Sequence, residues 1–186
     1  MIRDIERVIA NELMPDEVML WAGQPNPAKL FTKADIYLVP LTILWCGVAL
    51  GILSTGLPGL VIGVPAGAVA LYCLVGRFFT KAFRKKRTVC AVTNRRVMQI
   101  MLNASGEKKI VSLDIKTVLN ESVVLHNDGC GSLCFGDIPS FSQAYANTGM
   151  DFMPSHQIND ALAFFDIHNA LRVLQIYKGA KYGPMM

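Results

Sequence analysis

The most informative absence in this sequence is charge, because no Asp, Glu, Lys, Arg or His occurs from Ile36 to Gly76. A transmembrane helix needs about 20 mostly apolar residues, so this segment is too long for one span and has room for two short ones. Its middle, residues 54–59 (STGLPG), is rich in turn formers and helix breakers. The sequence therefore predicts a transmembrane hairpin with arms at 36–53 and 59–76.

The alternative is a buried helical hairpin inside a soluble protein. Helices that are apolar on every side are buried either in a large protein or in a membrane. A chain of 186 residues has little core to spare for two such helices. We therefore favour the membrane. Ionisable residues that mark an ion path are missing from the spans, which argues against a transporter or pump acting alone.

Acidic residues are also missing between Arg77 and Glu107, whereas eight of the 18 Lys and Arg residues lie between Arg77 and Arg96. Lys and Arg are enriched on the cytoplasmic side of membrane spans, and both ends of a hairpin lie on the same side. We therefore expect both termini in the cytoplasm, with only the turn crossing over. A cleavable signal is not expected, because the first 20 residues hold five acids and no apolar core.

Cysteine is sparse: the five residues, at positions 46, 73, 90, 130 and 134, form no regular framework. An odd, irregular set argues against a disulfide scaffold. Cys130 and Cys134 need two further ligands to bind zinc, and only His126 can approach Cys134 across a hairpin, so we expect no metal and no cofactor. The glycines of residues 129–136 miss the dinucleotide spacing, and no serine lies in a nucleophile elbow. We predict no catalytic residues; a membrane enzyme that uses Cys90 or the His126 region is the least favoured alternative.

Glycines recur at helical spacing within the hairpin. They are Gly47 and Gly51 in the first arm, and Gly59, Gly63 and Gly67 in the second. Small residues at this spacing allow helices to approach closely in lipid. We expect the two arms to pack on each other, with packing between chains as the alternative.

Outside the hairpin, apolar spacing predicts an amphipathic helix at 2–13 that packs on the cytoplasmic domain or on a partner rather than on lipid. Residues 21–27 are a turn-rich lead-in. Strands are predicted at 88–93, 95–102, 108–113, 117–121, 122–126 and 132–135. Residues 136–156 are expected to form a long loop. A helix is predicted from the N-cap Asn159 through residue 177, ending at Gly179.

This order of elements resembles the bacterial membrane proteins that carry a pleckstrin-homology-like (PH-like) domain. The similarity covers most of the chain from Glu17 to Tyr177. The residues that carry it are 17 and 21–25 (WAGQP), 84–97 (RKKRTVCAVTNRRV), 128–136 (DGCGSLCFG), 152 and 158–161 (INDA). The resemblance implies a strongly bent antiparallel sheet or barrel of seven strands that is capped by a C-terminal helix. It implies no reaction.

The expected divisions are 1–35 (N-terminal helix and lead-in), 36–76 (hairpin), 77–178 (PH-like domain) and 179–186 (tail). Immediately after the hairpin lies a group of cations that we call the basic segment: Arg77, Lys81, Arg84, Lys85, Lys86 and Arg87. Such residues attract anionic lipid headgroups by about 1 kcal/mol each near the surface. The alternative is that they only set the topology. Nucleic acid is not expected as a partner, because the segment already faces lipid phosphate.

The sequence thus predicts a non-enzymatic protein of the bacterial inner membrane with two spans. It would act as a scaffold or accessory subunit, with other membrane proteins or a second copy as partners. The alternative is a module that binds anionic lipid or peptide through the basic segment, together with Lys108 and Lys109.

Overall fold

A computed structural model describes residues 4–103, 106–126, 129–137, 147–149 and 161–183. The chain forms two compact units. One, the β domain, contains the described residues up to 29, those from 83 to 137 and those from 161 to 183. The other, the helical unit, is built on residues 30–82.

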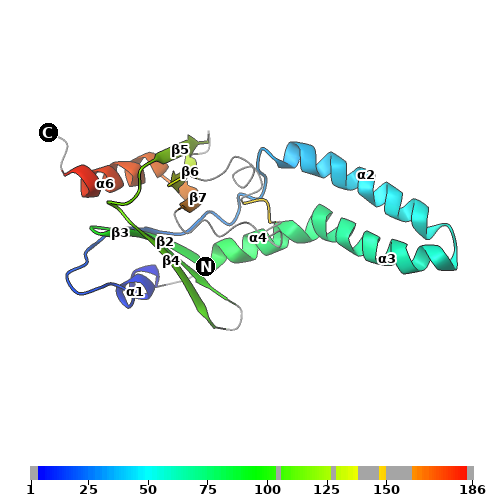
Figure 1. Cartoon of the computed structure of the whole chain (residues 1–186), viewed down its shortest axis with the longest axis horizontal. Coiled ribbons are helices and arrows are strands. Elements are labelled where there is room, and N and C mark those ends of the chain that lie inside the picture. The colour runs from blue at the N-terminus through cyan, green and yellow to red at the C-terminus, as the bar shows by residue number, and fades with distance from the viewer. Residues whose placement is uncertain (1–3, 104–105, 127–128, 138–146, 150–160, 184–186) are drawn as a thin grey trace. The chain divides into compact units, whose positions relative to one another are not determined.

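The helical unit contains the predicted hairpin. Helix α2 (Asp35–Leu53) is followed by a short turn and by α3 (Leu57–Leu71), which continues through a π-helical turn, η1 (Tyr72–Gly76), into α4 (Arg77–Lys86). In Figure 1 this continuous helix runs antiparallel to α2. Both helices are long and apolar enough to cross a membrane. Their large apolar side chains are mostly exposed, as is typical of a surface that is solvated by lipid.

The glycines of the hairpin fall into two groups. Gly59 and Gly63 are buried against the first arm, where a Cβ at Gly63 would lie 2.7 Å from Cγ of Leu53. A Cβ at Gly59 would overlap the carbonyl oxygen of Ile52. In contrast, a Cβ at Gly47, Gly51 or Gly67 would meet nothing within 4 Å. Close contact between the arms therefore requires glycine only near the turn.

The first sheet of the β domain is antiparallel, in the order β1-β2-β3-β4. Its strands are β1 (Met19–Gly23), β2 (Thr88–Thr93), β3 (Arg96–Leu102) and β4 (Lys108–Asp114). The sequence predicted the last three strands. It did not predict β1, whose last three residues belong to the segment 21–27 that was expected to form turns before the hairpin. Only the distant partner β2 makes this segment a strand, because the Gly and Pro that follow it indicate a turn.

Both faces of this sheet are covered over β2 and β3. Helix α1 (Ile5–Ala10) is shorter than the predicted 2–13, and it packs on the β domain as expected. Ile9 is fully buried against Val89, Ala91, Met98 and Ile100 on the outer face of β2 and β3. The opposite face of the sheet contributes to the main core. Every residue of β2 is consequently buried, which explains why its sequence, TVCAVT, does not alternate between apolar and polar.

The second sheet has the order β5-β6-β7, again antiparallel. Its strands are β5 (Glu121–Leu125), β6 (Cys130–Phe135) and β7 (Leu162–His168), and helix α6 (Ala170–Tyr182) follows. The prediction of a separate strand at 117–121 was wrong, because residues 117–120 are a turn and an irregular connection and Glu121 begins β5. The predicted helix at 159–177 was wrong in its first half, which contains β7. Asn159 lies outside the described residues.

Strand β7 escaped detection because no Gly or Pro separates it from the helix. The break is instead Asn169, whose left-handed backbone (φ 53°) ends the strand directly before α6. Asparagine tolerates this conformation better than most residues. The helix also continues through Gly179, where the prediction ended it, to Tyr182. Two Phe and an Ile within 164–167 were the available indication of a strand.

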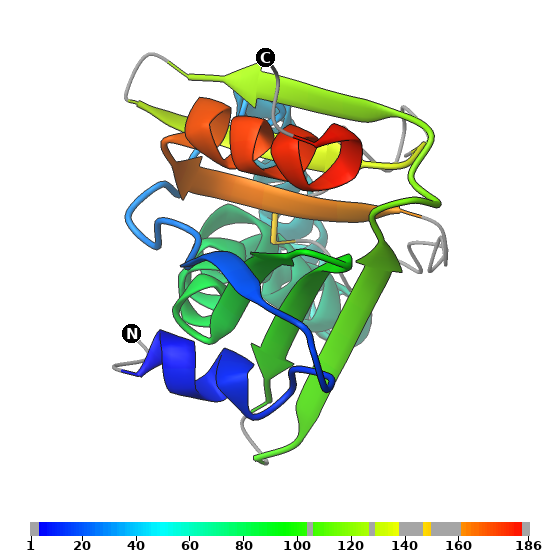
Figure 2. The same ribbon diagram turned by 90° about the vertical axis from the view of Figure 1, so that its left-hand side faces the viewer.

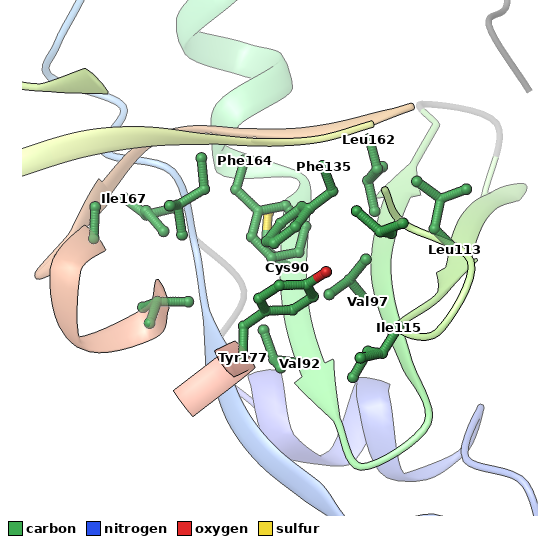
Figure 3. Packing of buried hydrophobic residues seen from close by; sticks show 14 residues of the cluster. Cys90, Val92, Val97, Leu113, Ile115, Phe135, Leu162, Phe164, Ile167 and Tyr177 are labelled. Carbon is green, nitrogen blue, oxygen red and sulfur yellow. The ribbon is translucent and has the colours of Figure 1, made fainter. Parts of the chain in front are cut away.

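The two sheets and α6 enclose one hydrophobic core (Figures 2 and 3). Tyr177 of α6 is fully buried, and its ring lies 4.7 Å from the ring of Phe135. Phe164 packs edge-on against Phe135 at 5.2 Å. The described part of the chain therefore has two antiparallel sheets and a C-terminal helix, and the sheets do not close into a barrel.

Replacing Gly59 with alanine tests the contact between the arms. We expect Gly59→Ala to lower the free energy of unfolding in detergent by about 1–3 kcal/mol, because the new methyl group overlaps a backbone oxygen. Gly67→Ala is the matched control, and it should be neutral or slightly stabilising because its surroundings are open. Thermal unfolding of both variants checks this. Equal changes in stability for Gly59→Ala and Gly67→Ala would contradict the close contact between the two arms at Gly59.

Candidate functional site

The structure divides the basic segment into two groups. Arg77 is fully buried in the helical unit, where its Nη1 lies 2.7 Å from Oδ1 of Asp35. The same carboxylate accepts hydrogen bonds from the backbone N–H and the hydroxyl of Thr32. The guanidinium also stacks over the ring of Phe78, 4.7 Å from its centroid. This ion pair joins the start of α2 to the first residue of α4.

Lys81 and Lys85 have equally specific partners. Lys81 is 3% exposed, and its Nζ donates to the carbonyl oxygen of Leu30 at 2.5 Å within the helical unit. In the β domain, Nζ of Lys85 donates to the carbonyl oxygen of Lys29 at 2.6 Å and pairs with Asp166. We call Arg77, Lys81 and Lys85 the cationic face of α4, because residues four apart lie on the same side of a helix.

The other members of the basic segment lie at the surface. Arg84 and Lys86 are exposed, and Arg87 is half-buried with its guanidinium 4.0 Å above the ring of Phe83. Three of the six predicted headgroup ligands, Arg77, Lys81 and Lys85, are thus buried in contacts with the protein itself. The four-residue spacing of 77, 81 and 85 was the signal in the sequence that separated the two groups.

Asp166 is the centre of a polar cluster in the β domain. Its side chain is 3% exposed, and Oδ2 lies 2.5 Å from Nζ of Lys85. Lys29 and His126 approach Oδ1 at 3.8 and 3.7 Å. The backbone carbonyl oxygen of Asp166 accepts a hydrogen bond from the N–H of Asn26 at 2.9 Å. The cluster connects β7, the end of α4 and the segment that follows β1.

A bulge in β7 turns Asp166 toward these partners. Gly131 pairs with Ile167 and Leu133 with Phe164, so β7 has one extra residue between these pairs. Asp166 has a left-handed backbone (φ 50°), and its N–H donates to the hydroxyl of Ser132 at 3.2 Å. The bulge lets Phe164 and Ile167 both enter the core, and it directs the carboxylate away from it. Sequence reasoning missed this residue, because it placed the segment in a helix.

Among the residues considered for metal binding, His126 is not the neighbour of Cys134. His126 lies beside Cys130, whose carbonyl oxygen accepts its backbone N–H, whereas Cys134 is opposite Ser122. The Sγ atom of Cys130 lies 3.5 Å from Nδ1 of His168. Within the described residues no group of three His, Cys, Asp or Glu side chains is arranged to hold a metal ion. Cys90 belongs to the core, and burial raises the pKa of its thiol, so it is protonated and inert.

A third ion pair, between Glu17 and Arg96, fixes the start of β1. The Oε1 atom of Glu17 accepts hydrogen bonds from Nε of Arg96 at 2.9 Å and from the hydroxyl of Thr93 at 2.7 Å. Its Oε2 accepts from the backbone N–H of Met14 at 2.8 Å. Burial by itself raises the pKa of Glu17, but the hydrogen bonds from Arg96, Met14 and Thr93 outweigh it and lower that pKa.

The β domain also contains a half-open pocket of about 300 Å³ between β1 and the first two turns of α6. Strand β1 is an edge strand, and its outer side pairs with no other described strand. The lining residues are Leu20, Trp21, Ala22, Gly23, Gln24, His168, Asn169, Arg172, Val173 and Ile176. Both polar side-chain atoms of Gln24 are shielded from solvent without a hydrogen-bond partner in the described structure.

Comparison with known proteins gave no match to a protein-family model, to a curated protein or to a solved structure.

Removing the charge of Asp166 tests the polar cluster. Asp166→Asn leaves Lys85 buried without its counter-ion, so we expect a loss of about 3–5 kcal/mol in the free energy of unfolding. The double variant Asp166→Asn with Lys85→Met should recover much of this loss, because the buried charge of Lys85 is then absent as well. Chemical denaturation of the full chain in detergent measures both. No recovery in the double variant would contradict a role for the ion pair.

Acidification tests the Glu17 ion pair. Because folding lowers the pKa of Glu17, its contribution to stability is present above the ordinary pKa of 4.5 and is lost as the pH falls through the lowered value. Glu17→Gln should therefore be less stable than the parent at neutral pH and less sensitive to pH below 4.5. Glu6→Gln, at an exposed position on α1, is the control. Parallel stability curves for the parent and Glu17→Gln would contradict this assignment.

Proposed function

We propose that this protein is a non-enzymatic scaffold or accessory subunit of a membrane protein assembly in the bacterial inner membrane. Its hairpin spans the membrane twice, and its PH-like domain lies on the cytoplasmic side with both termini. The observation that carries the proposal is the apolar surface of α2 and α3, which exposes Leu44, Val61 and Ile62 by more than half. Water solvates such a surface poorly, whereas lipid or another apolar helix covers it without cost.

The β domain supports an interaction role. Four strands in one antiparallel sheet, three in a second and a C-terminal helix agree with the PH-like fold that the resemblance implies. The buried charged side chains of Asp166, Glu17 and Lys85 are paired in contacts that stabilise the fold. Buried pairs of this kind position chain segments rather than carry out chemistry. The free edge of β1 and the open pocket beside it offer a surface for a partner.

The alternative, binding of anionic lipid through the basic segment, has less support. Arg77, Lys81 and Lys85 are at most 5% exposed and have protein partners. A headgroup would have to break those contacts or use only Arg84, Lys86 and the half-buried Arg87. Three cations near a surface attract an anionic membrane by about 3 kcal/mol, which favours topology and loose contact more than recognition.

The composition of the native particle tests the proposal. We expect gentle detergent extraction, followed by mass analysis of the intact particle, to find this chain in a stoichiometric assembly with at least one other membrane protein. Extraction in a harsher detergent that dissociates the assembly is the control. A monomer without partners under both conditions would overturn the proposal. A particle made only of this chain would leave self-association and would exclude an accessory role.

A further inference from the structure

The pocket between β1 and α6 has the form of a site for an extended chain. Strand β1 spans five residues, about 17 Å at 3.3 Å per residue, and the pocket follows it from Leu20 to Gln24. An edge strand presents unpaired N–H and C=O groups on alternate residues, and these groups pair readily with an added strand. The other wall consists of α6 residues from Asn169 to Ile176. A strand added to β1 would therefore lie beside α6.

The chemistry of the lining selects the occupant further. Val173 and Ile176 supply an apolar wall, and Trp21 lies at the edge of the core, 6.1 Å from the ring of Phe164. The amide group of Gln24 is shielded from solvent, so the apolar wall and the edge of β1 are what the open pocket presents to a ligand.

The charge of the lining has one sign. Arg172 is exposed, and it forms no ion pair with any residue that the structure describes. The lining contains no Asp or Glu. Guanidinium groups bind carboxylates through paired hydrogen bonds, so the pocket is complementary to an acidic side chain.

We infer that the groove between β1 and α6 binds an extended segment of a partner protein, which adds as a strand to the free edge of β1 and places a carboxylate on Arg172. This inference rests on the proposed function and names the class of partner. Strand addition gives affinity through the main chain, and pockets for alternate side chains give specificity. Arg172 favours a partner strand that carries an acidic side chain over apolar strands that lack one.

The test uses the full chain in lipid nanodiscs and blocked eight-residue peptides of alternating valine and threonine with one central glutamate. Two versions place the glutamate on either face of the strand. We expect one of them to bind and to slow hydrogen exchange at residues 19–23, with no change at β4, the other edge of the sheet. Arg172→Glu should weaken binding about tenfold or more and should favour a peptide in which lysine replaces the glutamate. Lys116→Glu, an equal charge change at an exposed turn, should leave binding within about twofold.

Controls separate strand addition from other modes of binding. A peptide with proline at its centre lacks a ladder donor, so its binding should be lost. Protection of β4 instead of β1, equal effects of the two charge variants, or no binding by either glutamate peptide would overturn the inference. Mass analysis of the native particle keeps the two proposals apart: a hetero-assembly without peptide binding retains the scaffold and rejects the groove. Protection of residues 19–23 that rises with protein concentration in the absence of peptide would assign the groove to a second copy and would also overturn the inference.

Discussion

The arrangement of this chain depends on three cations on one face of α4, which hold the segment that enters the hairpin. Arg77 pairs with Asp35, Lys81 donates to Leu30 and Lys85 donates to Lys29. Each contact joins the chain at or just before the start of α2 to a residue of α4. The need for such contacts follows from the sheet, because β1 and β2 are adjacent antiparallel strands and the whole hairpin is inserted between them. Both ends of the insertion must therefore return to the same place.

Because of this requirement, part of the positive charge after the hairpin has a structural role. Lys and Arg beside a span are usually interpreted through their effect on topology and lipid. Here three of them satisfy backbone carbonyls and two carboxylates, so their removal would affect folding before it affected membrane binding. A buried pair costs desolvation, and replacement by apolar residues is often tolerated. What an ion pair adds is direction: Asp35 pairs with Arg77, Asp166 pairs most closely with Lys85, and both cations lie on α4.

Much of the fold could be predicted from the sequence, because the signals were local. The uncharged segment, its central turn and the strands β2 to β6 each follow from composition over a few residues. Strand β1 and strand β7 could not be predicted, since their pairing partners are distant in the chain and their boundaries carry weak signals. Asn169 ends β7 without Gly or Pro, and Gly23 to Pro25 resemble a turn. The candidate groove is built from these two regions, β1 and the junction of β7 with α6, which explains why sequence reasoning did not find it.

The groove and the hairpin are also connected through the chain itself. The ion pair between Glu17 and Arg96 fixes the start of strand β1. The segment after β1 is fixed by the hydrogen bond that the N–H of Asn26 donates to the backbone carbonyl oxygen of Asp166. An edge strand that is held at both ends is already in the conformation that strand addition needs, so a partner does not have to order it on binding. Asp166 also holds Lys85, the last member of the cationic face. Asp166 thus holds the end of α4 through its carboxylate and the segment after β1 through its backbone carbonyl oxygen, and one bulge in β7 presents both groups.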